Sequence, residues 1–135
     1  MSPDVVRAKL SLLQQVLVDL APHVEASREE QEEHHYEIER QVQLAVDQCV
    51  AIARRFLIIK QVPLPDTNRE LFVLIGKEKI VPTPLSRALA DAVGLRNLLV
   101  HEYGSIDYGI FFGGLKSGYE AFLQFSKVVR QFLEK

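Results

Sequence analysis

The chain is poor in the features that mark exported, disulfide-bonded or membrane-spanning proteins. Cys49 is the only cysteine among 135 residues, which excludes an intramolecular disulfide and a zinc site built from several cysteines. No run of about 18 apolar residues is free of charge, and the N-terminal residues lack the basic-then-apolar order of a signal peptide. We therefore expect a cytoplasmic protein with no membrane segment.

A large net charge is also missing. The 16 basic and 18 acidic residues leave a net charge of −2, so the molecule as a whole does not attract polyanions and any nucleic-acid site must be local. Basic residues do outnumber acidic ones between positions 54 and 87, which is typical of a region that guides RNA; scattered solvent-facing cations are the alternative. The candidate RNA contacts in this region are Arg54, Arg55, Lys77, Lys79 and Arg87.

Apolar residues recur at three- and four-residue intervals along most of the chain, whereas strict alternation is nearly absent. This periodicity predicts an all-α fold, and the length is that of a single domain covering residues 1–135. We expect helices over residues 3–22, 27–60, 69–79, 83–104 and 107–134. The second of these is long enough to suggest a bundle in which it helps a second subunit to dock.

Capping signals support these boundaries. Ser27 and Glu30, and likewise Thr67 and Glu70, have capping-box spacing, and Thr83 precedes a proline suited to the first position of a helix. The last helix contains four glycines that weaken it by about 1 kcal/mol each relative to alanine. Either a neighbour packs closely there or that half is irregular; the glycines are Gly109, Gly113, Gly114 and Gly118.

The segment "GLRNLLVHEYGS" concentrates polar side chains at the end of the fourth predicted helix. On a helical wheel Arg96 falls inside the apolar stripe. A guanidinium there costs several kcal/mol unless it is paired or the stripe borders a polar cavity. Asn97 and His101 are four residues apart and share a second face.

An arginine beside a histidine suits phosphodiester cleavage. The guanidinium binds phosphate oxygens, and the imidazole transfers a proton to or from the ribose and the leaving oxygen. Because the segment has one histidine, the second proton-transfer role needs water or a second histidine, which a two-fold symmetric dimer supplies. The alternative is structural: Arg96 pairs with Asp47 or Asp91, and His101 bonds a backbone carbonyl.

No metal site is expected. His34 and His35 are adjacent, so on a helix their side chains diverge by about 100°. Only one histidine–carboxylate pair at i, i+4 spacing is then available, between His35 and Glu39. Cys49 is interpreted as a core residue.

Three stretches resemble the HepT-like toxin branch of the HEPN superfamily. "RNLLVHEY" is similar to its Arg-Asn-x-x-x-His-x-Tyr signature, and "YEIERQVQLAVDQCVAIARRFL" to its second helix. The residues from "LFVLIGKEK" to "EYGSID" resemble the segment around the signature. The resemblance implies an up-and-down bundle that forms a homodimer with a composite cleft around the motif.

The resemblance also implies a function. It is that of a metal-independent endoribonuclease, the toxin of a type VII toxin–antitoxin pair, which cuts tRNA or mRNA to leave a 2′,3′-cyclic phosphate and needs no cofactor. Arg96 and His101 would be catalytic, Asn97 would position the imidazole or the phosphate, and Tyr103 would receive AMP from an MntA-type nucleotidyltransferase antitoxin. Arg40 lines the shared cleft or pairs with Glu37. The alternative function is a non-catalytic HEPN scaffold that binds nucleotide or RNA and partners a nucleotidyltransferase.

Overall fold

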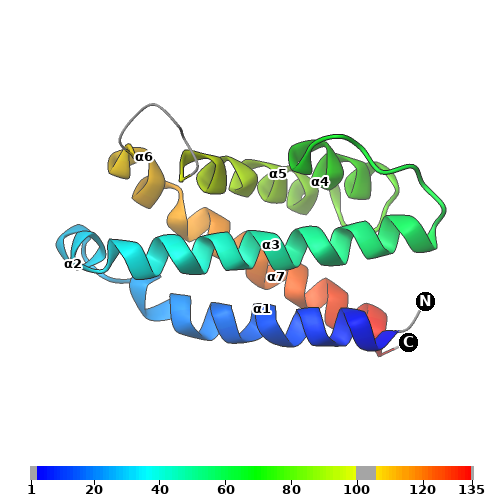
Figure 1. Ribbon diagram of the computed structural model, residues 1–135, viewed down its shortest axis with the longest axis horizontal. Helices are drawn as coiled ribbons and strands as arrows, with labels where there is room; N and C mark the ends of the chain where they lie inside the picture. The colour runs from blue at the N-terminus through cyan, green and yellow to red at the C-terminus, as the bar shows by residue number, and fades with distance from the viewer. Residues whose placement is uncertain (1–2, 100–105, 135) are drawn as a thin grey trace.

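The computed structural model describes residues 3–99 and 106–134, which form seven α-helices and no strand (Figure 1). This confirms the all-α prediction. No helix among these residues is long and apolar enough to cross a membrane. The helices are α1 (Pro3–Val24), α2 (Arg28–Glu33), α3 (His35–Ile59), α4 (Asn68–Lys77), α5 (Thr83–Leu98), α6 (Tyr108–Gly113) and α7 (Leu115–Leu133).

The four long helices α1, α3, α5 and α7 run alternately up and down, as predicted. In the view of Figure 1, α3 lies between α1 and the α4–α5 pair, and α7 passes behind it. Both chain ends lie at one end of the bundle, whereas the short helices α2 and α6 lie at the other end. The last turn of α5, which carries Arg96 and Asn97, faces the α2–α6 end.

Two apolar clusters hold the helices together. The larger one, formed by α1, α3, α4, α5 and α7, includes fully buried Cys49, as predicted. A smaller one, which we call the end cluster, joins the helices at the α2–α6 end. Each fully buried leucine or phenylalanine contributes about 1.5–3 kcal/mol relative to its exposed state. The buried members of the end cluster are Leu20, Ile38, Val42, Leu95, Phe111, Phe112 and Leu115.

The helix predicted over 27–60 is in fact two helices, α2 and α3, which meet at His34 (φ −109°, ψ 25°). The capping box at Ser27 is confirmed, with its hydroxyl accepting from the Glu30 amide at 3.1 Å. Backbone hydrogen bonds continue across the break, because His34 donates to Glu30 and accepts from Ile38. The three- and four-residue spacing of apolar side chains also continues across the break. The sequence pattern therefore predicted one helix.

The last predicted helix is also divided, at Gly114, into α6 and α7. Both explanations offered for its glycines are confirmed: a neighbouring helix packs closely against some of them, and the helix is irregular near others. A Cβ on Gly114 or Gly118 would lie 2.7 or 2.8 Å from a methyl group of Leu95, so α5 packs closely here. A Cβ on Gly113 would meet nothing within 4 Å.

The remaining boundaries differ by a few residues. α1 continues past Pro22, which removes one backbone donor but lies in the last turn. α5 begins at Thr83 after an N-cap at Pro82, so Pro84 occupies the second helical position and not the first position predicted from the sequence. The Thr67 cap of α4 is confirmed by a 3.1 Å bond from the Glu70 amide. At its other end α5 stops at Leu98, with Leu99 as its C-cap, so it is shorter than the helix predicted over 83–104. Gly104 itself lies outside the described residues.

Candidate functional site

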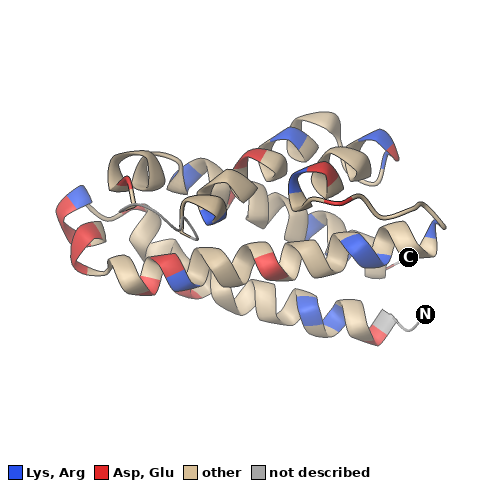
Figure 2. Ribbon diagram, turned by 45° about the horizontal axis from the view of Figure 1, so that its top comes forward, with Lys and Arg blue, Asp and Glu red and all other residues tan. Residues whose placement is uncertain are grey.

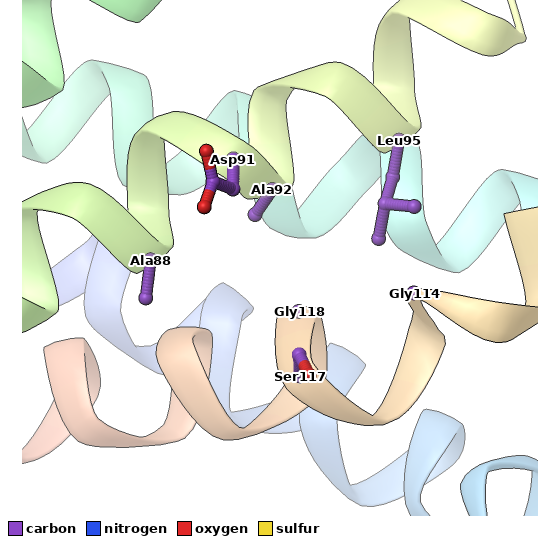
Figure 3. A pocket seen from close by; sticks show the side chains of 7 residues that line it. All are labelled: Ala88, Asp91, Ala92, Leu95, Gly114, Ser117 and Gly118. Atoms are coloured by element: carbon purple, nitrogen blue, oxygen red, sulfur yellow. The ribbon is translucent and has the colours of Figure 1, made fainter. Parts of the chain in front are cut away.

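Arg96 lies in the last turn of α5 and is half-buried, with 27% of its side chain exposed. The preceding residue, Leu95, inserts its methyl groups beside Gly114 and Gly118 (Figure 3). This contact fixes the rotation of the last turn of α5, because a leucine held against two glycines leaves little freedom for the helix to turn. The helical wheel placed Arg96 inside the apolar stripe, and its partial burial is consistent with that prediction.

The Arg96 guanidinium is only partly satisfied by the protein. Its Nη2 atom lies 3.8 Å from Oδ1 of Asp47 on α3, which is a long ion pair. Its Nε atom is buried and has no hydrogen-bond partner among the described residues. Asp91, the other predicted partner, lies instead 3.5 Å from Nη2 of Arg69. Nε itself is out of reach of a ligand, but the long ion pair and the partial exposure leave other guanidinium donors for the oxygens of a bound phosphate.

The structure places two of the four predicted motif residues. Asn97 follows Arg96 and is exposed. His101 and Tyr103 lie outside the described residues, as does Glu102 between them. On either side of this gap, Leu99 and Ile106 are half-buried against the end cluster.

Charged residues at seven-residue spacing form a row on α3. Arg40, Asp47 and Arg54 are all exposed, and residues seven apart share a helix face at a rise of about 10 Å. Figure 2 shows blue, basic stretches on both sides of a red, acidic one along α3. Since Arg96 contacts Asp47, it lies beside the middle of this row, which we call the α3 arginine row.

The other candidate RNA contacts lie apart from this row. Arg55 is half-buried on α3; the exposed residues are Lys77 at the end of α4, Lys79 in the following turn and Arg87 on α5. Lys79 has φ 58° and belongs to the tight turn that ends α4. No contact among the described residues brings these four cations to Arg96.

His35, Glu39 and Tyr108 form a polar group, which we call the His35 cluster; of its contacts, only the His35–Glu39 pair was evident from the sequence. Nδ1 of His35 lies 2.6 Å, and the Tyr108 hydroxyl 2.8 Å, from Oε2 of Glu39. Burial, together with the hydrogen bond to Glu39, raises the pKa of Tyr108 to about 12. The spacing of His35 and Glu39 indicated their contact, but no local signal predicts that Tyr108 meets a residue 69 positions away.

The two adjacent histidines bind different carboxylates. His35 contacts Glu39, whereas Nδ1 of His34 lies 4.0 Å from Glu37. In the part of the chain that the structure describes, no three His, Cys, Asp or Glu side chains are arranged to hold a metal ion. Burial raises the pKa of the Cys49 thiol, so this cysteine is a poor nucleophile.

A cavity of about 170 Å³ lies between α5 and α7 (Figure 3). Leu95, Gly114 and Gly118 form one end of it, and its polar side chains are those of Asp91 and Ser117. None of the residues that line the cavity is basic, so it offers no cation to a phosphate. We interpret it as a packing gap left by the small residues of this helix contact.

Comparison with known proteins agrees with the motif. The sequence profile of the family described as "Ribonuclease HepT-like" matches residues 9–129. The mRNA nuclease HepT of Shewanella oneidensis is 30% identical over 89 residues, which are 66% of this chain and 67% of that protein. The tRNA nuclease HepT of Aphanizomenon flos-aquae is 38% identical over 69 residues, or 51% and 47% of the two chains.

Solved structures share the fold. The tri-AMPylated Shewanella oneidensis HEPN toxin in complex with MNT antitoxin matches with a TM-score of 0.83 at 23% identity, covering 97% of this chain and 99% of that one. A crystal structure of a toxin–antitoxin with AMP-PNP matches with a TM-score of 0.80 at 22% identity, covering 95% and 98%. At these sequence identities, below 25%, the structural match shows a shared fold.

Proposed function

The chain belongs to the ribonuclease HepT-like family, and from this premise we propose that it is an endoribonuclease and the toxin of a type VII toxin–antitoxin pair. Its curated relatives are named as nucleases of mRNA and of tRNA. A solved structure of the same fold is a toxin bound to its antitoxin. The RNA substrate of this chain therefore belongs to one of these two classes.

The observation that carries the proposal is the half-satisfied guanidinium of Arg96. An ion pair as long as 3.8 Å, on a side chain that is 27% exposed, leaves guanidinium donors that a ligand can reach. A phosphate group accepts such donors in a planar, two-point arrangement. Arg96 then stabilises the charge that develops on the phosphate during cleavage.

The chemistry assigned to the motif needs no metal ion. His101 takes the proton of the ribose 2′-hydroxyl, whose oxygen attacks the adjacent phosphorus. The bond to the 5′-oxygen breaks, and this leaving group receives a proton from the partner subunit's His101 or from water. The products are a 2′,3′-cyclic phosphate and a 5′-hydroxyl, and Asn97 holds the phosphate or the imidazole in place. A homodimer around the motif supplies the second histidine.

We propose that the RNA backbone binds along the α3 arginine row, with its phosphates contacting Arg40 and Arg54. Arg40 and Arg54 each lie about 10 Å along α3 from Asp47, the residue beside Arg96. Two exposed cations on either side of a phosphate-binding arginine suit a backbone that continues beyond the cleaved bond. The acidic total charge does not oppose this, because the attraction is local.

In this proposal, AMPylation of Tyr103 inhibits the toxin. An MntA-type nucleotidyltransferase transfers AMP to its hydroxyl, which adds bulk and negative charge close in sequence to Arg96 and His101. Added negative charge repels an incoming phosphate. The AMPylated state of the toxin of known structure supports this assignment.

The experiment that tests the proposal compares four proteins prepared without antitoxin: wild type, His101→Ala, Arg96→Lys and Arg130→Ala. Arg130 is an exposed arginine on α7 and serves as the control. End-labelled tRNA and mRNA are incubated in EDTA, and the new 3′ ends are identified. We expect wild type and Arg130→Ala to leave 2′,3′-cyclic phosphate, and His101→Ala to be inactive. Arg96→Lys should lose about 10²-fold in kcat/KM, because lysine lacks the two-point fork.

A different outcome favours the second candidate function. If unmodified wild-type protein cuts none of the RNAs, or His101→Ala cuts equally well, the ribonuclease assignment fails. The non-catalytic HEPN scaffold then explains the unused Arg96 donors as a site for bound nucleotide or RNA. Binding that persists without cleavage would separate this scaffold from a purely structural dimer.

A further inference from the structure

The His35 cluster ties α6 to α3 through short hydrogen bonds. An ionised carboxylate only accepts, so Nδ1–H of His35 and the hydroxyl of Tyr108 both donate to Oε2 of Glu39, at 2.6 and 2.8 Å. The hydroxyl and the imidazole Nδ1 are themselves 3.0 Å apart. Both His35 and Glu39 are shielded, with 27% and 17% of their side chains exposed. Removing one partner would therefore leave shielded polar groups unsatisfied.

The cluster is placed where the chain returns to the bundle after the motif. Tyr108 is the first residue of α6, and Asp107 caps this helix by accepting from the Ile110 amide at 3.1 Å. Ile106 packs against the end cluster, as does Leu99 on the other side of the gap. Tyr108 therefore fixes one of the two described attachment points of the segment that carries His101 and Tyr103.

The cluster does not belong to the phosphate site itself. His35 and Asp47 are twelve residues apart on α3, or about 18 Å along the helix axis. A proton-transferring group must come within about 3 Å of the atom that it serves. An imidazole anchored to Glu39 at that distance from the Arg96–Asp47 pair does not serve the same phosphodiester within one subunit.

We infer that Tyr108, Glu39 and His35 are positioning residues that hold the motif segment in its catalytic arrangement by anchoring α6 to α3. This role rests on the proposed ribonuclease function. The aromatic contacts of Tyr108 locate its ring, which stacks on Phe112 with centroids 5.4 Å apart. The hydroxyl then determines how the start of α6 sits on α3. A misplacement of about 1 Å in a catalytic group costs on the order of 10²-fold in rate.

The variant that isolates this role is Tyr108→Phe, because phenylalanine keeps the ring on Phe112 and removes only the hydroxyl. Tyr119→Phe is its matched control: Tyr119 is half-buried on α7, and its hydroxyl makes no hydrogen bond within the described residues. We expect Tyr108→Phe to lower kcat about 10-fold with KM unchanged, and Tyr119→Phe to leave both unchanged. His35→Ala should lower kcat, whereas the exposed neighbour His34 tolerates the same change.

Glu39 tests whether the hydrogen bonds act as a unit. Glu39→Gln keeps an oxygen that accepts from Tyr108 and His35 and should retain most of kcat, whereas Glu39→Ala should lose about as much as Tyr108→Phe. The double variant Glu39→Ala with Tyr108→Phe should be no slower than Glu39→Ala alone, because coupled groups are not additive. Equal loss in Gln and Ala variants, or fully additive losses, would overturn the positioning role.

A second readout does not depend on RNA cleavage. Amide hydrogen exchange is measured on wild type, Tyr108→Phe and Tyr119→Phe at one temperature. We expect faster exchange in Tyr108→Phe from Leu99 through α6, with unchanged exchange in α1 and α4. If wild-type protein cuts no RNA, the proposed function fails, and this measurement alone decides whether the cluster anchors the segment. Unchanged exchange in α6, or faster exchange throughout the bundle, would overturn the inference.

Discussion

Nη2 of Arg96 and Oδ1 of Asp47 lie 3.8 Å apart, and this contact joins the end of α5 to the middle of α3. Both side chains are partly exposed, so the pair itself adds only about 0–1 kcal/mol to stability. Its more important effect is on a ligand, because a carboxylate at this distance competes with a phosphate for the same guanidinium. In the proposed function, this contact therefore tunes the binding of RNA more than it stabilises the fold.

Replacing Asp47 with asparagine should tighten RNA binding. Two unit charges about 4 Å apart in water interact by about 1 kcal/mol, which corresponds to roughly 5-fold in affinity. We expect KM for RNA cleavage to fall about 5-fold at low salt and less at high salt, since salt screens exposed charges. Urea unfolding should change by less than about 1 kcal/mol. A large loss of kcat instead would mean that Asp47 mainly orients Arg96.

The α3 arginine row predicts a particular salt dependence. Each phosphate contact that is lost reduces the slope of log affinity against log salt by about 0.7 for single-stranded RNA. Arg40→Ala and Arg54→Ala should each weaken RNA binding and lower this slope, as measured by filter binding with the inactive His101→Ala protein. The control Arg130→Ala on α7 should change neither. Equal slopes in all variants would remove the row from the RNA path.

Close packing between α5 and α7 predicts opposite effects at two glycines. Gly118→Ala places a methyl group 2.8 Å from Cδ1 of Leu95 and should destabilise the protein by about 1–3 kcal/mol. Gly113→Ala meets open space on a helix and should stabilise it by up to about 1 kcal/mol. Thermal and urea unfolding of both variants test this. Because Leu95 precedes Arg96, Gly118→Ala should also lower kcat.

The Tyr108 hydroxyl predicts a loss of stability in alkali. Its pKa is raised to about 12 in the folded protein by burial and by Glu39, against about 10 in an unfolded chain. The folded state therefore holds this proton more tightly, and the added stability is fully present below pH 10 and is lost as the pH rises toward 12. Tyr108→Phe should flatten this part of the curve of unfolding free energy against pH, whereas Tyr119→Phe should not.

The same hydroxyl predicts which tyrosines accept AMP. A raised pKa and two neighbours within 3.0 Å make Tyr108 a poor and enclosed nucleophile. Incubation with the nucleotidyltransferase and ATP, followed by peptide mass spectrometry, should place AMP on Tyr103 and none on Tyr108. AMP on Tyr108 would show that α6 leaves α3 when the antitoxin binds.

Local signals in the sequence determined most of the secondary structure. The 3.6-residue period gave the all-α class because it reports which face each helix buries. The caps at Ser27 and Thr67 were recognisable because a capping residue and its partner lie within one turn. The position of Arg96 within an apolar stripe was likewise a property of one helix, so the wheel identified it as unusual.

Tertiary structure alone decided how these helices meet. Backbone hydrogen bonds continue across the break at His34, and the spacing of apolar residues is unchanged there, so the sequence pattern did not predict it. The choice of Asp47 over Asp91 as the partner of Arg96 depends on how α5 lies against α3. The contact between Tyr108 and Glu39 joins helices that are far apart in the chain. Such pairings follow from the packing of whole helices, which no local pattern encodes.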